Sequence, residues 1–291
     1  ALTGLTFSGS GDMDNGIGYS VKYTFEGGDE AGHAVTFDLG SGLKLGIGYD
    51  QSYGIETVKA ISPYVNNRRA DITGAHRGLP TAARKPLGPD VWDTSSGENA
   101  IGLSFKNDLA AISFGFTPVR DVNTSTDAIN ASSATSSEYG TATSLGVKLT
   151  PVDGLTIGFG ASSEESDVAA NADPKGTTIG FQYKIGSFAI GYQEIENIID
   201  STASTEDSVE IQEGGVAYKV NDALTIGVFA ANINYLTVNT DNGVETGMGI
   251  VQVGYNLGPA VIQYDYADGS DLNSTKDTEY EIHKVKIKVL F

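Results

Sequence analysis

The chain has 291 residues, with 18 Lys and Arg against 37 Asp and Glu, which gives a formal net charge of −19. Nucleic-acid binding is not expected from this balance, because it depends on basic side chains that neutralise phosphates. The absence of cysteine excludes disulfide bonds, Cys-ligated metal sites and thiol nucleophiles. No apolar run approaches the roughly 20 residues of a membrane helix, so a helical span is excluded and a β-strand span is not.

Apolar and polar residues alternate along most of the chain, a pattern typical of β-strands with two unlike faces. In residues 15–26, Tyr19 and Val21 fall on one face, whereas Ser20 and Lys22 fall on the other. The same division recurs in residues 43–50 and in 176–185. The sequence therefore predicts an all-β protein.

The alternating segments are joined in turn by tight Gly, Asn, Asp and Pro turns and by longer polar connections such as 121–137 and 198–208. Short turns at one end and long loops at the other are typical of membrane β-barrels. The predicted strands are 2–12, 15–26, 33–40, 43–52, 98–106, 109–118, 139–150, 155–165, 176–185, 187–197, 209–220, 223–236, 245–257, 260–268 and 279–291.

We therefore expect a single transmembrane antiparallel β-barrel domain over residues 1–291. Bacterial single-chain barrels have even strand numbers, and fifteen strands are predicted here. Both 2–12 and 279–291 would run toward the short turns. We expect about sixteen strands in the complete protein, with a first strand upstream of Ala1 that is missing from this sequence.

Two stretches resemble the general porins of Gram-negative outer membranes. The opening "LTFSGSGDMDNGIGYSVKYTFEGGDEAG", followed by "VTFDLGSGLKLGIGYD", resembles the second to fifth strands of alphaproteobacterial porins. The final "YEIHKVKIKVLF" ends on Phe291, and a terminal aromatic residue resembles the assembly signal of outer-membrane barrels. The resemblance implies a homotrimeric channel in the bacterial outer membrane, in contact with its lipid and lipopolysaccharide.

The longest connection, 53–97, is where these porins have a third loop that folds into the barrel and narrows it. A barrel of about sixteen strands has a water-filled lumen unless something constricts it. The connection has six basic residues against four acidic ones, whereas the rest of the chain has 12 against 33. Rings of Arg and Lys are expected in anion pores. The predicted constriction residues are Arg68, Arg69, Arg77, Arg84 and Lys85, with Asp71 and with His76 as a pH-sensitive neighbour.

An alternative for this basic stretch is a solvated excursion that pairs with acidic loops or with lipopolysaccharide phosphates outside the barrel. A second basic feature follows from strand register, because many lysines fall on the polar side of their strands and near the short turns. The predicted lumen-lining residues are Lys22, Lys44, Lys106, Lys148, Lys184, Lys219, Lys286 and Lys288, together with Asp38 and Asp50.

Carboxylates concentrate in the long loops, for example at Glu164, Glu206 and Asp268. An acidic extracellular mouth is therefore expected, with Ca²⁺ as a possible ligand, although such sites need several converging oxygen atoms. His33, His76 and His283 have no metal-ligand spacing, and no serine has a base specified near it. The sequence contains no sign of an enzyme.

Three functions are compatible with these features. The first is passive diffusion of small hydrophilic solutes and ions, with a transverse field between the arginines of 53–97 and wall carboxylates. The second is a substrate-specific anion channel, which would saturate at low anion concentration. The third is a soluble or secreted all-β binding or surface protein, which the extent of outward apolar surface disfavours.

Overall fold

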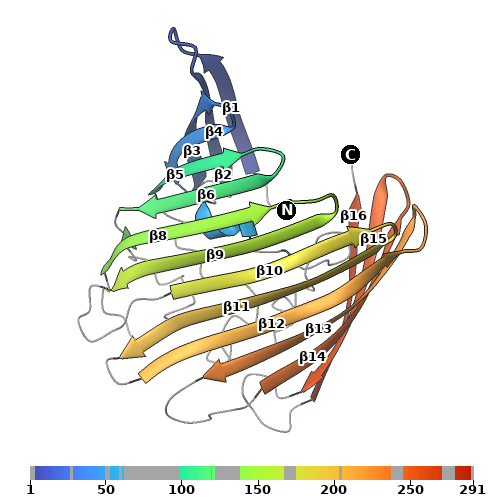
Figure 1. Ribbon diagram of the computed structural model, residues 1–291. Coiled ribbons are helices and arrows are strands. Elements are labelled where there is room, and N and C mark those ends of the chain that lie inside the picture. The colour runs from blue at the N-terminus through green and yellow to red at the C-terminus, as the bar shows by residue number, and fades with distance from the viewer. Residues whose placement is uncertain are drawn as a thin grey trace.

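The computed structural model describes residues 4–26, 29–49, 53–58, 61, 99–118, 120–121, 138–166, 175–202, 205–236, 245–270 and 279–289. These residues form one antiparallel sheet in which each long strand pairs with the next along the chain. Figure 1 shows the sheet as a single curved surface. Among the described residues, no helix has the length and apolar character that crossing a membrane requires.

Fifteen strands make up the continuous path of the sheet. The first six, β1 to β6, are Gly4–Asp12, Gly18–Glu26, Asp29–Gly40, Leu43–Tyr49, Asn99–Lys106 and Ala110–Thr117. The next five, β8 to β12, are Glu138–Leu149, Leu155–Ser166, Lys175–Ile185, Phe188–Thr202 and Thr205–Lys219. The last four, β13 to β16, are Leu224–Leu236, Glu245–Asn256, Ala260–Ser270 and Glu279–Val289.

Two short elements complete the described structure. Strand β7, Arg120–Asp121, pairs only with β8 and is not part of the fifteen-strand path. Strands β6 and β8 pair directly with each other. A 3₁₀ helix, η1, covers Gly54–Val58 and lies on the concave side of the sheet against β6, β8 and β9 (Figure 1).

The fifteen predicted strands are confirmed, since each overlaps one strand of the path. The predicted loop at 198–208 is wrong, because β11 continues to Thr202 and β12 begins at Thr205. Polar residues there extend the hairpin with Asp200 opposite Asp207, beyond a register shift after Ile198. In the described sheet, β1 and β16 are the end strands, and each pairs with a single neighbour.

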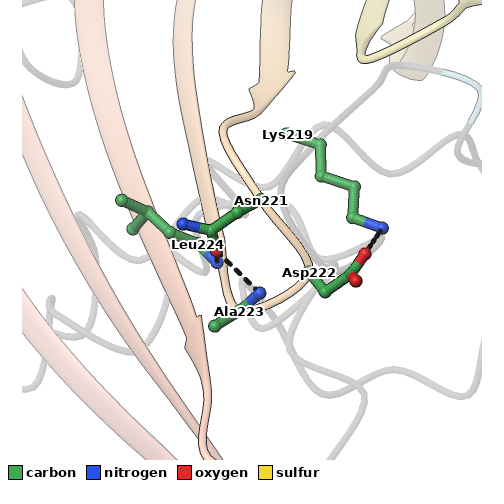
Figure 2. A network of polar contacts seen from close by, with 5 residues as sticks. All are labelled: Lys219, Asn221, Asp222, Ala223 and Leu224. Carbon is green, nitrogen blue, oxygen red and sulfur yellow. Dashed lines mark hydrogen bonds and ion pairs between the residues drawn. The ribbon is translucent and has the colours of Figure 1, made fainter.

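Asn side chains shape several of the short turns. In the β12–β13 turn, the Oδ1 of Asn221 accepts hydrogen bonds from the backbone N–H groups of Ala223 and Leu224, both at 2.9 Å (Figure 2). Asn107 does the same in the β5–β6 turn. Such side-chain bonds to nearby backbone groups favour turns over further strand.

The outer face of the sheet, which is the face opposite η1, is apolar and exposed. Leu5, Phe7, Ile179, Val228 and Ile287 are all more than half exposed. Exposed apolar surface of this extent is unusual on a soluble monomer and is typical of the band that a barrel presents to lipid. The outward-facing apolar pattern predicted from the alternation is confirmed.

Candidate functional site

The inner face of the sheet, defined as the face that carries η1, is the candidate functional site. Glycines under residues 53–58 and 61 let this part of the connection lie close to the wall. A Cβ added at Gly46 or Gly102 would clash with the Tyr53 ring, and one added at Gly158 would clash with Ile61. Gly102 pairs with Gly46 on one side and Gly115 on the other, so three adjacent strands lack side chains at this height. This glycine floor positions the start of the long connection.

Serines next to the glycine floor hold η1 by its first backbone groups. The Gly54 N–H donates to Ser113 Oγ and the Ile55 N–H donates to Ser144 Oγ, both at 2.8 Å. Both serines are buried on the inner face. Because the first N–H groups of a helix have no partner within the helix, these serines satisfy them.

Gln193 of β11 fixes the end of the described segment. Its Oε1 accepts from the Ile61 N–H at 3.0 Å, and its Nε2 donates to the Val58 carbonyl at 3.1 Å. The Gln182 Nε2 also donates to the Ile61 carbonyl at 3.1 Å. Gln193 is fully buried, so the loss of either bond would leave a buried polar group unsatisfied.

Burial changes the acidity of the one tyrosine in this segment. Tyr53 stands over the glycine floor, and its partial burial raises the pKa of the phenol above the ordinary value. The ionised form is disfavoured because it would lose hydration next to the wall.

Part of the inner face is apolar, which corrects the expectation of a wholly hydrophilic wall. Ile195, Ile211, Phe229 and Ile250 are at most 2 % exposed, and they belong to one buried cluster with Ile55, Val58 and Ile61. The alternation does not separate the two faces of β11 to β14, because apolar residues occupy both faces there. The polar and exposed parts of the wall lie elsewhere.

The lysines whose side chains the structure describes lie almost entirely on the inner face. Pairing and alternation place eight lysines with described side chains there: Lys22, Lys44, Lys106, Lys148, Lys184, Lys219, Lys284 and Lys286. Lys288 pairs with Val261, and its side chain lies outside the described residues. Only Lys175, among the lysines whose side chains are described, falls on the outer face. Lys284 was missed by the prediction, although its place beside Lys286 in "HKVKIKV" gives the same alternating signal.

Of the two aspartates predicted to line the lumen, the structure describes one. Asp38 is exposed on the inner face, where its Oδ2 lies 3.7 Å from Lys44 Nζ. Asp50 lies outside the described residues. A further carboxylate, Asp265, is buried on β15, where it accepts hydrogen bonds from Gln252 and Gln263 and lies 3.6 Å from Lys286 Nζ. Sequence reasoning missed this network, because no local signal places three strands side by side.

Charge is divided unequally between the two faces of the strands. Five carboxylates with described side chains lie on the inner face: Asp12, Asp38, Glu164, Glu213 and Asp265. Eight lie on the outer face: Glu165, Glu194, Glu196, Glu210, Glu245, Asp268, Glu279 and Glu281. Eight lysines against five carboxylates give the inner face +3, and one lysine against eight carboxylates gives the outer face −7.

The predicted constriction residues Arg68, Arg69, Asp71, His76, Arg77, Arg84 and Lys85 lie outside the described residues, as does Phe291. The described part of their connection, 53–58 and 61, is held on the inner face. In the described ranges, no three His, Cys, Asp or Glu side chains come close enough together to hold a metal ion.

The comparisons with known proteins agree with this geometry. Residues 2–272 match the family model described as Gram-negative porin. A porin structure refined at 1.8 Å is similar, with a TM-score of 0.63 and 14 % identity, covering 99 % of this chain and 92 % of that one. OmpT of Vibrio cholerae gives 0.63 and 13 %, covering 99 % and 85 %, and an anion-selective porin from Comamonas acidovorans gives 0.62 and 12 %, covering 99 % and 88 %. None of the curated proteins matches the chain.

The chain belongs to the Gram-negative porin family. Members of this class are channels rather than enzymes. The outer apolar band and the polar, charged inner face are the two surfaces that such a channel needs. The protein is accordingly an outer-membrane porin that forms a water-filled channel for passive diffusion of small hydrophilic solutes.

Proposed function

We propose that the channel is a general diffusion pore that prefers anions. The observation that carries this proposal is the division of charge: the inner face has a net charge of +3 on its described side chains, although the whole chain has −19. The carboxylates that make the protein acidic lie largely on the outer face and in the connections. A permeating ion therefore meets a surface whose sign is opposite to that of the molecule.

The physical basis is the field inside a narrow passage. Charges of one sign on low-dielectric walls focus the field and raise the local concentration of counter-ions. Exposed lysines such as Lys22 and Lys44 remain solvated, so they attract anions without the desolvation cost of a buried charge. Selectivity from such a wall is weak and falls with salt, since the Debye length is about 10 Å at 0.1 M.

The connection 53–97 would supply the constriction of this pore. Its first residues, 53–58 and 61, are fixed to the inner face by Ser113, Ser144 and Gln193, which supports a course inside the barrel rather than outside. Four arginines follow within residues 68–84. In this proposal Arg68, Arg69, Arg77 and Arg84 narrow the path and add to its positive field, with Lys85, Asp71 and His76 beside them.

The decisive measurement is the reversal potential of single channels in a tenfold KCl gradient. Wild type should show chloride preference, and an Arg68/Arg69/Arg77/Arg84→Ala variant should lose much of it. Lys175→Gln is the matched control, because this lysine lies on the outer face and its removal should leave the potential unchanged. Cation preference in the wild type, or an unchanged preference in the arginine variant, would contradict the respective part of the proposal.

A substrate-specific anion channel remains the second candidate, favoured by the same inner lysines. The two candidates differ in the dependence of current on anion concentration. A general pore gives a current that grows nearly in proportion to concentration, whereas a specific pore saturates at low concentration. Competition by phosphate or by an organic acid against chloride current would decide between them.

The assembly proposed for this channel is a homotrimer in lipid and lipopolysaccharide. One structural neighbour, the OmpT of Vibrio cholerae, is described in a trimer form, with a TM-score of 0.59. Native mass spectrometry of the detergent-solubilised protein tests the trimer. Binding of Ca²⁺ at the acidic loops is a further proposal, and calorimetric titration with CaCl₂ of protein depleted of divalent ions tests it.

A further inference from the structure

Three lysines occupy comparable places near the short-turn ends of consecutive descending strands. Lys106 closes β5, Lys148 lies one residue before the end of β8, and Lys184 lies one residue before the end of β10. All three belong to the inner face, by their pairing with Ala111 or Ala189. We call Lys106, Lys148 and Lys184 the lysine arc.

The backbone of the lysine arc is fixed by the turns beside it. The Lys106 N–H donates to the Gly42 carbonyl at 3.0 Å, and the Lys184 N–H donates to the Gly154 carbonyl at 2.9 Å. Gly42 and Gly154 have positive φ angles, and a Cβ at either would clash with the lysine carbonyl opposite. Lys106 and Lys184 are therefore held at defined positions by glycines that no other residue type could replace without strain.

The surroundings of the arc leave its charges available to a ligand. The pairing partners on the same face are small, namely Ala111, Gly158 and Ala189. Within the described ranges, no ion pair joins the arc to a carboxylate, including Asp108 and Asp153 of the nearest turns.

Three other lysines of the inner face already have a carboxylate partner. Lys219 Nζ lies 2.8 Å from Asp222 Oδ1 (Figure 2), and Lys44 and Lys286 lie near Asp38 and Asp265. Within the described ranges, the arc therefore differs from these three lysines in having no carboxylate partner as well as in its position.

The spacing of the arc suits an extended anion rather than a single small ion. Lys106 and Lys148 both lie opposite Ala111, two strands apart, which corresponds to about 10 Å between their backbones. Flexible four-carbon side chains allow their ammonium groups to approach one ligand from both sides. Lys148 pairs with Gly158, which pairs with Gly180, so Lys184 lies four residues, or about 13 Å, further along β10 toward the turn. An extended polyvalent oxyanion can therefore interact with two neighbouring charges of the arc together, whereas chloride interacts mainly with one at a time.

We propose that Lys106, Lys148 and Lys184 form a binding site for small polyvalent oxyanions, such as linear polyphosphates, at the short-turn mouth of the channel. This inference rests on the proposed anion preference and locates a binding step in it, at the periplasmic side where short turns lie. The arc lies on alternate strands of the run from β5 to β10, and none of its residues belongs to the predicted constriction set. The positive charges of the free site would attract anions that enter from that side. Binding at the site would then slow their passage.

The test uses inorganic tripolyphosphate on the whole protein in planar bilayers with known orientation. Tripolyphosphate added on the short-turn side should reduce the chloride current at lower concentration than on the other side. In Lys106→Gln/Lys148→Gln/Lys184→Gln, this one-sided block should need about tenfold more tripolyphosphate at low salt, because the variant lacks the three charges that attract the anion and solvent screens each exposed charge. Block of equal strength from both sides, or an unchanged block in the variant, would overturn the proposal.

A binding measurement tests the oxyanion site independently of the proposed anion preference of the channel. Calorimetric titration of tripolyphosphate into detergent-solubilised protein should give weaker binding for the triple variant and unchanged binding for Lys175→Gln. Retained far-ultraviolet circular dichroism establishes that the variant is folded. Reduced binding in the variant together with cation preference in bilayers would keep the site and reject the anion-preferring pore. Equal binding by wild type and variant would reject the site, whatever the conductance.

Discussion

Two regions of the inner face treat their side chains in opposite ways. Under residues 53–58 and 61 the wall includes glycines, small serines and the buried Gln193, so its role is to hold another segment at a fixed place. In the lysine arc the backbone is fixed and the side chains are not, so its role is to present charge. We therefore expect substitutions in the first region to alter stability and pore size, and those in the second to alter ion preference alone.

The largest effect is expected when the glycine floor is filled. Gly102→Val would place a side chain where the Tyr53 ring lies, and overpacking of this kind typically costs about 1–3 kcal/mol. The displaced segment should also change the single-channel conductance. Chemical unfolding and conductance are measured together, with Gly9→Val as control, because a Cβ at Gly9 meets nothing within 4 Å. Wild-type values for both quantities in Gly102→Val would contradict the role of the floor.

A smaller change in conductance is expected at Gln193, although its cost in stability is at least as large. In Gln193→Leu, the Ile61 N–H and the Val58 carbonyl lose their partner, and buried unsatisfied groups cost about 1–3 kcal/mol each. The loop end should become mobile, which increases the noise of the open-channel current. Gln212→Leu on the exposed outer face of β12 is the matched control. Quiet channels in Gln193→Leu would show that this glutamine does not position the loop.

The smallest effect is expected at the ion pair of the β12–β13 turn. The hydrogen bond from Lys219 holds the pKa of Asp222 below its usual value. Stability from this pair is therefore present above the unfolded pKa, about 3.9, and is lost as the pH falls through the lower folded pKa. Asp222→Asn should lower the unfolding midpoint slightly at pH 7, and the difference from wild type should disappear near pH 2. A difference that grows on acidification would contradict the assignment.

Much of the wall could be predicted from the sequence. Alternation places Lys44, Lys148 and Lys184 opposite the apolar residues of their strands, and the structure has them on the inner face. Gly46, Gly102 and Gly158 also fall on that face by the same rule. That they form a floor depends on which strands become neighbours, and on a segment from elsewhere in the chain that lies across them. The alternation of side chains along a strand indicates neither the neighbouring strands nor the segment that crosses them.

The failures have the same origin. Ile195 and Ile211 look like outward residues by hydrophobicity alone, yet they pair with each other on the inner face and are buried in the cluster that includes Ile55. The polar stretch 198–208 looks like a loop, but β11 and β12 continue into it. Backbone hydrogen bonds between paired strands do not need apolar side chains. In both cases the contacts made across strands outweighed the local preference.

The sequence by itself determined the strands, their turns, the apolar outer face and the basic character of the other face. It could do so because a period of two and the Asn, Asp and Gly turn residues act over a few neighbouring positions. Only the tertiary structure decided that residues 53–58 and 61 rest on glycines of β4, β5 and β9 and are held by Gln193, more than 130 residues further on. Contacts of that separation arise when the sheet curves, and no local pattern encodes them.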